Sequence, residues 1–170
     1  MQIEHPFPWH RIPQTLEATP VIIQHLVTGI SDAEADYRPD PERLTIREII
    51  PHIAEWEQTI LVHLVRICRE DVPNLDDDNT AEPMTGPPDV AAQCALFARC
   101  RAATVAFLKD RTTADWSREA IRSRYGPTTL DAQAVMLAMH DTYHIRQIVE
   151  WKERYADLRG LSGLMKPDRP

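Results

Sequence analysis

The sequence has 170 residues, of which 43% are hydrophobic and 26% are charged, and this balance is typical of a folded globular domain and excludes a disordered chain. Its length suits one domain, spanning residues 1–170, with a core of its own. The formal net charge is -7 at pH 7, and because an acidic surface repels phosphate groups we expect no nucleic-acid partner.

The N-terminal residues MQIEHPFPWHRIPQ contain no apolar stretch of the kind found in signal peptides. No uninterrupted apolar run has the length needed to cross a bilayer, so we expect a cytoplasmic protein without a membrane partner. The three cysteines contain no CxxC pair and are expected to be reduced, mostly buried thiols: Cys68, Cys94 and Cys100.

The first predicted helix runs from about Pro13 to Thr28, because its apolar residues recur at intervals of three and four. Gly29 follows at a position where helices commonly end. Pro20 lies inside the segment, so we expect a kink or a restart there. The next residues, SDAEADYRPDPERLT, contain two prolines and no periodicity, and they predict an irregular loop with short turns.

The second predicted helix begins after Thr45, and Glu48 stands three residues later, where it completes a capping box. Its segment, IREIIPHIAEWEQTILVHLVRICRE, carries apolar residues at helical spacing along one face. Pro51 lies too deep for the free first positions of a helix, so we expect a bend just before His52.

Residues 71–88, DVPNLDDDNTAEPMTGPP, form the longest predicted loop. The segment is acidic, rich in proline and without a core pattern. A loop of this length in a compact domain is either functional, for example a lid, or a plain solvated connector, and we favour the connector.

A third helix is predicted near DVAAQCALFARCRAATVAFLKD, and a possible short helix follows after Thr113. The fourth helix begins at a cap formed by Thr128 or Thr129 and runs to about Tyr155. Each amphipathic helix needs neighbours to bury its apolar stripe. The predicted fold is therefore all-α, a four-helix bundle with a long loop between helices two and three.

Two histidines on the fourth helix, His140 and His144, are four residues apart and therefore lie one above the other on the same face. Because the chain has 7 histidines, such a pair also arises by chance. However, the pair lies on or beside the apolar stripe that should face the other helices, which favours a metal-binding role. The stripe is Leu130, Ala134, Leu137, Ile148 and Trp151.

A third ligand is expected from the second helix, because three ligands with one open position make a metal site. His52 and His63 are eleven residues apart, which separates them by roughly 16 Å along the helix axis, so only one can join a common ion. His52 has Glu48 and Glu55 within reach as acceptors for its second N–H. The other histidines are interpreted as hydrogen-bonded boundary residues: His5, His10, His25 and His63.

The segments LTIREIIPHIAEWE and HDTYHIRQI, some ninety residues apart, resemble the DinB/YfiT-like superfamily. Its members are four-helix bundles in which a histidine on the second helix and an HxxxH pair on the last bind a divalent metal. The resemblance extends over nearly the whole chain in helix order and implies His52, His140 and His144 as the metal ligands, with Gln147 at the position of a Gln that often follows the pair. Leu44 stands where the family commonly has Trp.

The resemblance also implies a function, because members of the superfamily include metal-dependent transferases that use thiols such as bacillithiol or mycothiol, and others resemble hydrolases or isomerases. We therefore expect a metal-dependent enzyme of the thiol S-transferase type, with a small-molecule thiol and an electrophilic substrate as partners. Imidazole ligands suit several divalent ions; zinc or nickel is expected first, and iron or manganese is the alternative.

Two other functions are weighed against this one. A zinc protease has the HExxH spacing, but Asp141 replaces the required Glu and no histidine follows His144, so this reading is rejected. The second is a non-catalytic stress-response bundle protein whose metal site is structural or vestigial. Tyr143 and Arg146 flank the histidine pair and are interpreted as helix-surface residues.

A homodimer is expected, because family members commonly pair through helix faces. The fourth helix also carries more apolar residues than one core stripe requires: Val135, Met136, Met139 and Trp151.

Overall fold

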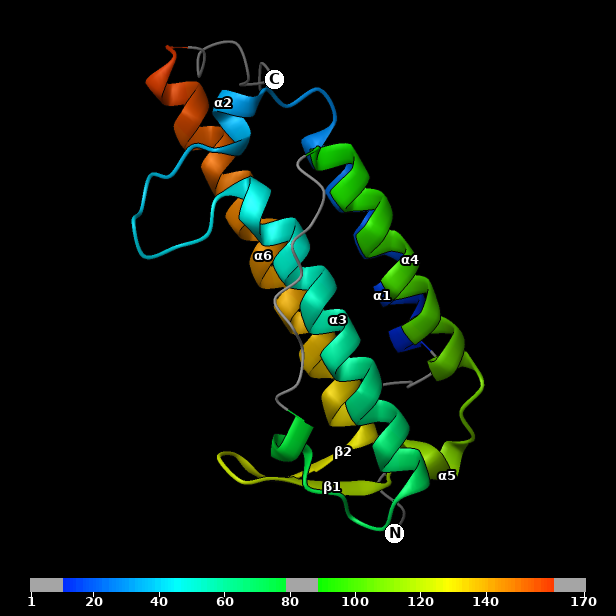
Figure 1. Ribbon diagram of the computed structural model, residues 1–170. Helices are drawn as coiled ribbons and strands as arrows, with labels where there is room; N and C mark the ends of the chain where they lie inside the picture. The colour runs from blue at the N-terminus through cyan, green and yellow to red at the C-terminus, as the bar shows by residue number, and fades with distance from the viewer. Residues whose placement is uncertain (1–10, 79–88, 161–170) are drawn as a thin grey trace, which may run out of the picture.

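Four long helices make up most of the computed structural model, which describes residues 11–78 and 89–160 (Figure 1). They are α1 (Ile12–Val27), α3 (Ile46–Arg69), α4 (Val90–Lys109) and α6 (Leu130–Leu158). Both α1 and α3 contact α4 and α6, so each helix packs against two others. The predicted four-helix bundle is therefore confirmed, and the helix boundaries differ from the predicted ones by a few residues at most.

The direction of the helices explains the long connection between α3 and α4. In Figure 1, α1 and α6 run upwards, whereas α3 and α4 both run downwards. Because α3 has 24 residues and is about 36 Å long, the chain has to return along the bundle before α4 can begin beside it. Residues 79–88 of the predicted loop lie outside the described part of the chain. The expectation that this loop is a connector, and not a lid, therefore stays a prediction.

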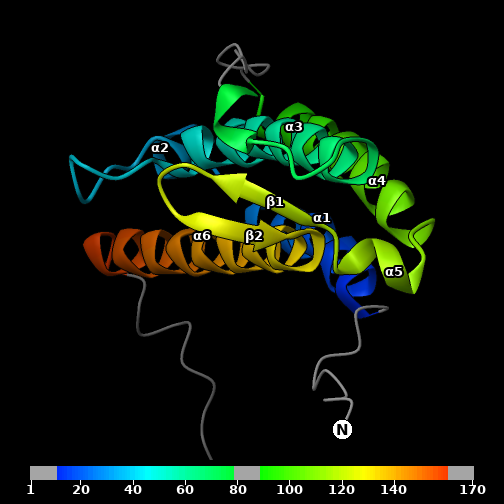
Figure 2. The same cartoon turned by 90° about the horizontal axis from the view of Figure 1, so that it is seen from below.

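A small β-hairpin at one end of the bundle was not predicted from the sequence. It pairs β1 (Glu119–Arg122) with β2 (Gly126–Thr129) in antiparallel register, and Figure 2 shows it lying across the ends of the helices. Gly126 closes the turn with φ +85°, a conformation that favours glycine. The hairpin is tied to the segment before η2 (Leu75–Asp78), because Ile121 N donates to Pro73 O at 2.9 Å.

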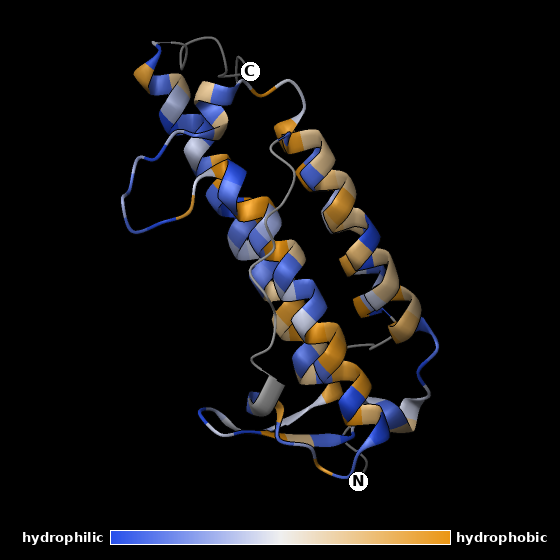
Figure 3. Ribbon diagram, in the orientation of Figure 1, coloured by the Kyte–Doolittle hydropathy of each residue, from blue (hydrophilic) through white to orange (hydrophobic). Residues whose placement is uncertain are grey.

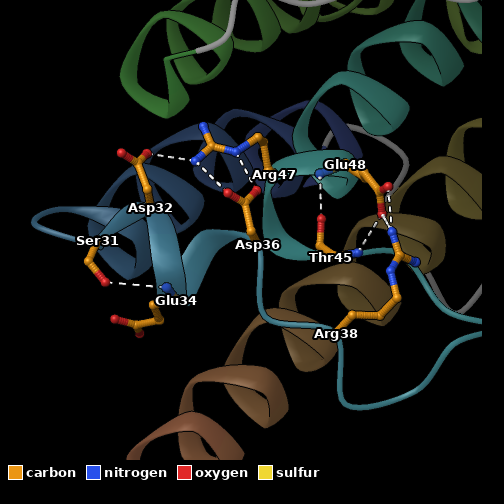
Figure 4. A network of polar contacts seen from close by, with 8 residues as sticks. All are labelled: Ser31, Asp32, Glu34, Asp36, Arg38, Thr45, Arg47 and Glu48. Carbon is orange, nitrogen blue, oxygen red and sulfur yellow. Dashed lines mark hydrogen bonds and ion pairs between the residues drawn. The ribbon is translucent and has the colours of Figure 1, made fainter.

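Two very short helices complete the described elements. α5 (Thr113–Trp116) is the short helix predicted after Thr113. α2 (Asp32–Ala35) lies in the predicted loop before α3, and Ser31 caps it. Figure 4 shows how this region holds the start of α3: Arg47 forms ion pairs with Asp32 and Asp36, both at 2.6 Å.

The predicted capping box at the start of α3 is present. The Thr45 hydroxyl accepts from Glu48 N at 3.3 Å, and Glu48 Oε2 accepts from Thr45 N at 2.8 Å (Figure 4). Arg38 also binds both oxygens of Glu48. These contacts satisfy donors that an uncapped helix would leave free, and they fix where α3 begins.

The helix α1 continues across Pro20, so the expected restart is wrong. A proline has no N–H, so Leu16 O loses the donor that a residue four positions later normally supplies. Arg101 of α4 replaces that donor, since its Nη1 donates to Leu16 O at 3.0 Å. The helix α3 is likewise continuous across Pro51, and the bend predicted there stays a prediction.

The buried apolar residues form two clusters, one towards each end of the bundle. Between them, each long helix contributes a buried polar residue at the same level: Thr19, Glu57, Arg101 and Asp141. Figure 3 shows the corresponding hydrophilic stretch midway along α4, between hydrophobic ends. The candidate functional site, formed by histidines of α3 and α6, lies in this polar middle of the bundle.

By length and composition, α4 is the one helix in the described residues that could cross a membrane. It instead packs against α1 and α3 and carries the buried Arg101. We interpret it as a core helix of the bundle.

Candidate metal centre

Three histidines from two antiparallel helices meet in the middle of the bundle. His52 comes from α3, and His140 and His144 lie one turn apart on α6. His140 Nε2 lies 3.2 Å from His52 Nε2 and 3.2 Å from His144 Nε2. The structure thus brings together all three residues that the sequence suggested as ligands.

The spacing of these nitrogens fits one divalent ion. Ligand nitrogens about 2.0–2.1 Å from a tetrahedral zinc ion lie about 3.3 Å from one another. The two measured separations of 3.2 Å are close to this value. Within the described chain, no further His, Cys, Asp or Glu joins the group, so an ion held there would keep a position open for another molecule.

The orientation of His144 is fixed by a chain of hydrogen bonds. Gln147 Nε2 donates to Leu44 O at 2.9 Å, so the amide presents its oxygen to His144 Nδ1 at 3.2 Å. An oxygen acceptor requires Nδ1 to carry the proton. His144 Nε2 is then left with a free lone pair pointing into the cluster, as a metal ligand needs.

His140 is held mainly by packing. Its Nδ1 is buried and has no hydrogen-bond partner in the described residues. Its ring stacks on Trp56, with centroids 5.1 Å apart and an interplanar angle of 29°. Trp56 lies one turn after His52 on α3, so the same helix provides one histidine of the cluster and positions a second.

Burial keeps all three imidazoles neutral at pH 7. It lowers the pKa of His140 to about 4, with further contributions from the charges of His52 and Arg101. It also lowers the pKa of His144 to about 4, helped by the two neighbouring histidines, and lowers the pKa of His52, where the charge of Glu55 opposes the shift. Neutral imidazoles have the lone pairs that a metal ion requires.

Two acidic residues near the three histidines, Glu48 and Asp141, pair with other side chains and not with the histidines. Glu48 accepts hydrogen bonds from Arg38 and Thr45, and within the described residues none joins it to His52. Asp141, considered only for its position in the HDTYH segment, is 2% exposed and binds Arg101 through both oxygens, at 2.6 and 2.9 Å. Of the carboxylates considered for His52, Glu55 is the one whose charge acts on it.

The buried role of Arg101 was missed in the sequence, because nothing in the pattern of α4 distinguishes it from the exposed Arg99 on the same helix. Besides Asp141, it binds Glu57 Oε2 at 2.9 Å through Nε. Thr19 Oγ1 donates to Asp141 Oδ2 at 2.8 Å. This network joins all four long helices directly beside the histidines.

The remaining histidines stay apart from the cluster. His63 is buried on α3, eleven residues beyond His52, and His25 is exposed on α1. His5 and His10 lie outside the described residues. Arg146 and Tyr143 are both exposed, as expected. The ring of Tyr143 also meets the ring of His144 edge-on, with centroids 5.0 Å apart.

Comparisons with known proteins identify the family and a solved structure with a similar fold. The family model of the DinB superfamily matches residues 15–148. YfiT from Bacillus subtilis, described as "a probable metal-dependent hydrolase with an unusual four-helix bundle topology", has the same fold with a TM-score of 0.76, 18% identity and coverage of 92% of each chain. No curated protein matches the chain.

Proposed function

The chain belongs to the DinB superfamily, as its motifs suggested, and on that premise we propose that it is a divalent-metal-dependent enzyme. The observation that carries the proposal is the convergence of three neutral imidazoles, which no fourth His, Cys, Asp or Glu of the described residues joins. Two of the three, His52 and His140, are only half-buried. A molecule from solution can therefore reach the fourth position, whereas a purely structural site would be closed by a fourth protein ligand.

A divalent ion bound by neutral histidines keeps its full +2 charge and lowers the pKa of a thiol or a water molecule placed beside it. The chain's own residues supply the arrangement around this position. Gln147 fixes the tautomer of His144, Trp56 fixes the ring of His140, and burial in the bundle keeps both rings neutral.

Thiol S-transfer is the reaction that we propose. A thiol has an ordinary pKa of about 8.5, whereas that of water is about 15.7, so a thiol needs less assistance to ionise. The thiol releases its proton to solvent, its sulfur forms a bond to an electrophilic carbon, and the leaving group departs with the electron pair of the broken bond. Asp141 cannot assist as a base, because Arg101 and Thr19 occupy its oxygens. The cosubstrate is a low-molecular-weight thiol of the bacillithiol or mycothiol kind.

Hydrolysis is the second candidate, because the similar fold of YfiT is described as that of a metal-dependent hydrolase. It needs a base to take a proton from water. Glu55 is half-buried one turn from His52, and its charge acts on that residue, so it is the base that we assign to this reaction.

The first experiment measures metal content in protein purified without a His-tag and without nickel resin. We expect one zinc or nickel ion per chain, and iron or manganese in their place remains compatible with a metal-dependent enzyme. Less than a tenth of an ion per chain, also after addition of these metals, contradicts the proposal.

The second experiment separates the two reactions. The metal-loaded protein is mixed with a small thiol and the electrophile monobromobimane, and, in a parallel assay, with nitrophenyl esters in the absence of thiol. We expect metal-dependent thioether formation that survives Glu55→Gln. Ester hydrolysis that is lost in Glu55→Gln assigns the hydrolase instead, and the absence of both reactions favours the non-catalytic, stress-response alternative.

Two further expectations remain proposals. We propose a cytoplasmic location, where low-molecular-weight thiols are reduced. We also propose a homodimer that forms through the face between α1 and α6, where Val135 is 39% and Met139 is 68% exposed. These side chains line an apolar cavity of about 350 Å³ together with Ile12, Thr15, Ala138 and Thr142. Trp151 does not belong to this surface, because it is fully buried in the core.

A further inference from the structure

A second cavity, of about 270 Å³ and with charged as well as aromatic residues in its wall, lies on the hairpin side of Trp56. It is formed by α3, the segment at η2 and the turn of the β-hairpin. The residues on which the argument depends are Trp56, Asp76, Arg122, Arg124 and Tyr125.

Two contacts connect the wall of the cavity to α6 near the three histidines. Trp56 forms part of its wall and stacks on the ring of His140. Arg122, also in the wall, donates from Nη1 to Met136 Sδ at 3.8 Å, and Met136 lies one turn before His140 on α6. The residues that α3 contributes to the wall, Trp56, Thr59 and His63, lie about one to three helical turns, or roughly 6–16 Å, beyond His52 along the helix axis.

Arg122 is mostly buried, but its guanidinium has only one long ion pair in the described residues. Its side chain is 15% exposed, and its ion pair with Asp76 is long, at 3.5 Å from Nε to Oδ1. A buried guanidinium is stable only with well-placed acceptors, and a carboxylate or phosphate can accept two of its N–H groups at once. Arg122 thus has donors left for a second anion.

Arg124 adds a second positive charge at the mouth of the cavity. Its backbone N donates to Asp76 Oδ2 at 3.3 Å, but its exposed guanidinium has no ion pair in the described residues. It lies 5.7 Å from the ring of Tyr125, and Arg122 lies 5.4 Å from the same ring. Two arginines against one aspartate leave a net positive charge of +1 around the cavity, on a chain whose net charge is -7.

We propose that this cavity is an anion subsite, in which Arg122 and Arg124 bind a carboxylate or phosphate group of the molecule that reacts at the three histidines. The aromatic walls, Trp56 and Tyr125, contact the part of the molecule that joins the anion to the reacting group. The inference rests on the proposed function for the reaction at the metal, but the binding of the anion requires no metal.

The test uses phenyl phosphate and benzoate as probes and benzyl alcohol as the neutral control. Binding is followed through the Nε–Hε signals of Arg122 and Arg124 in nitrogen-15 NMR spectra of the full chain, both metal-loaded and after chelator treatment. We expect one or both anions to shift these signals in both preparations, and the tighter probe identifies the anion. Because each arginine supplies charge-assisted hydrogen bonds, we expect Arg122→Gln and Arg124→Gln each to weaken binding about tenfold.

The matched control is Arg99→Gln, which removes an exposed arginine of α4 outside the cavity and should leave the affinity unchanged. Arg124 lies on an exposed turn, so its variant folds even if Arg122→Gln does not, and circular dichroism checks both. Equal binding of benzyl alcohol overturns the proposal, and so does unchanged affinity in Arg124→Gln. Anion binding that needs the metal and disappears in His144→Ala also overturns it, while leaving the proposed function intact.

Discussion

Gln147 is a positioning residue, because its amide links His144, a proposed metal ligand, to the backbone at Leu44. Replacing it by Leu keeps the volume and removes the acceptor. We expect Gln147→Leu to weaken metal binding about 10- to 100-fold, as is usual when a ligand loses the group that orients it. Competition with a chromogenic chelator measures the affinity.

The tautomer of His144 provides a second measurement that a purely structural role of Gln147 would not change. Nitrogen-15 NMR should show the proton on Nδ1 in the original protein and a mixture of tautomers in the variant. The control is Gln24→Leu on the exposed face of α1, for which neither quantity should change. Full affinity in Gln147→Leu would mean that packing alone orients the ring.

His52 and His63 offer a test of the ligand set, since both lie on α3 but only His52 reaches the pair on α6. We expect His52→Ala, His140→Ala and His144→Ala each to lose stoichiometric metal, whereas His63→Ala keeps it. The helical fold should survive, because the two apolar clusters do not include these side chains. Elemental analysis and circular dichroism measure both properties, and one ion per chain in His52→Ala would refute this ligand set.

At the level of single residues, the sequence indicated which histidines meet, but not which side chains surround them. Spacing and the family resemblance suggested His52, His140 and His144, because the i,i+4 relation survives in any helix. Neither could reveal that Glu48 binds Arg38 or that Asp141 binds Arg101, because these partners come from other parts of the chain. Arg122 was equally hidden, since its environment depends on how the hairpin packs.

Among the helices, α3 has the clearest local signal at its start, and the capping box there can be tested directly. Thr45→Ala removes the acceptor for Glu48 N, so we expect a loss of about 1 kcal/mol in the free energy of unfolding. Thr45→Ser keeps the hydroxyl and should retain most of that stability. Urea denaturation measures both, and equal stability of the Ala and Ser variants would show that the cap contributes nothing.

The elements themselves were predicted unevenly. Long helices with a cap, such as α3, carry their periodicity in the sequence, and so their existence was clear. The hairpin was not, because each strand has four residues and β1, EAIR, includes only two apolar ones. Its pairing depends on Gly126 and on contact with Pro73, which local patterns do not show. The continuity of α1 across Pro20 likewise depends on Arg101 of another helix.

For the whole molecule, the buried network of Arg101 fixes the level at which the four helices meet. Removing only the cation leaves Glu57 and Asp141 buried without compensation and Leu16 O without a donor. We expect Arg101→Met to reduce the free energy of unfolding by about 3–5 kcal/mol. Chemical denaturation measures the change.

The control for this prediction is Arg99→Met on the exposed side of the same helix, which should change stability by no more than about 0.5 kcal/mol. Neutralising the two acids as well, with Glu57→Gln and Asp141→Asn, should recover part of the loss, because the uncompensated charges are then gone. A stability loss in Arg101→Met no larger than that of Arg99→Met would mean that the network is not needed to hold the helices together.

At the scale of the whole molecule, the exposed apolar face between α1 and α6 is the surface through which we propose that two copies pair. Val135 and Met139 on α6 are exposed beside the apolar cavity, and Ile22 of α1 is 42% exposed two turns beyond Thr15. We expect this apolar face to be buried between two copies that pair around a two-fold axis. We expect light scattering at micromolar concentration to give the mass of two chains, and Met139→Glu to give the mass of one. The control is Tyr125→Glu, which changes an exposed residue of the hairpin and should stay dimeric. A monomeric mass for the original protein would rule out this assembly.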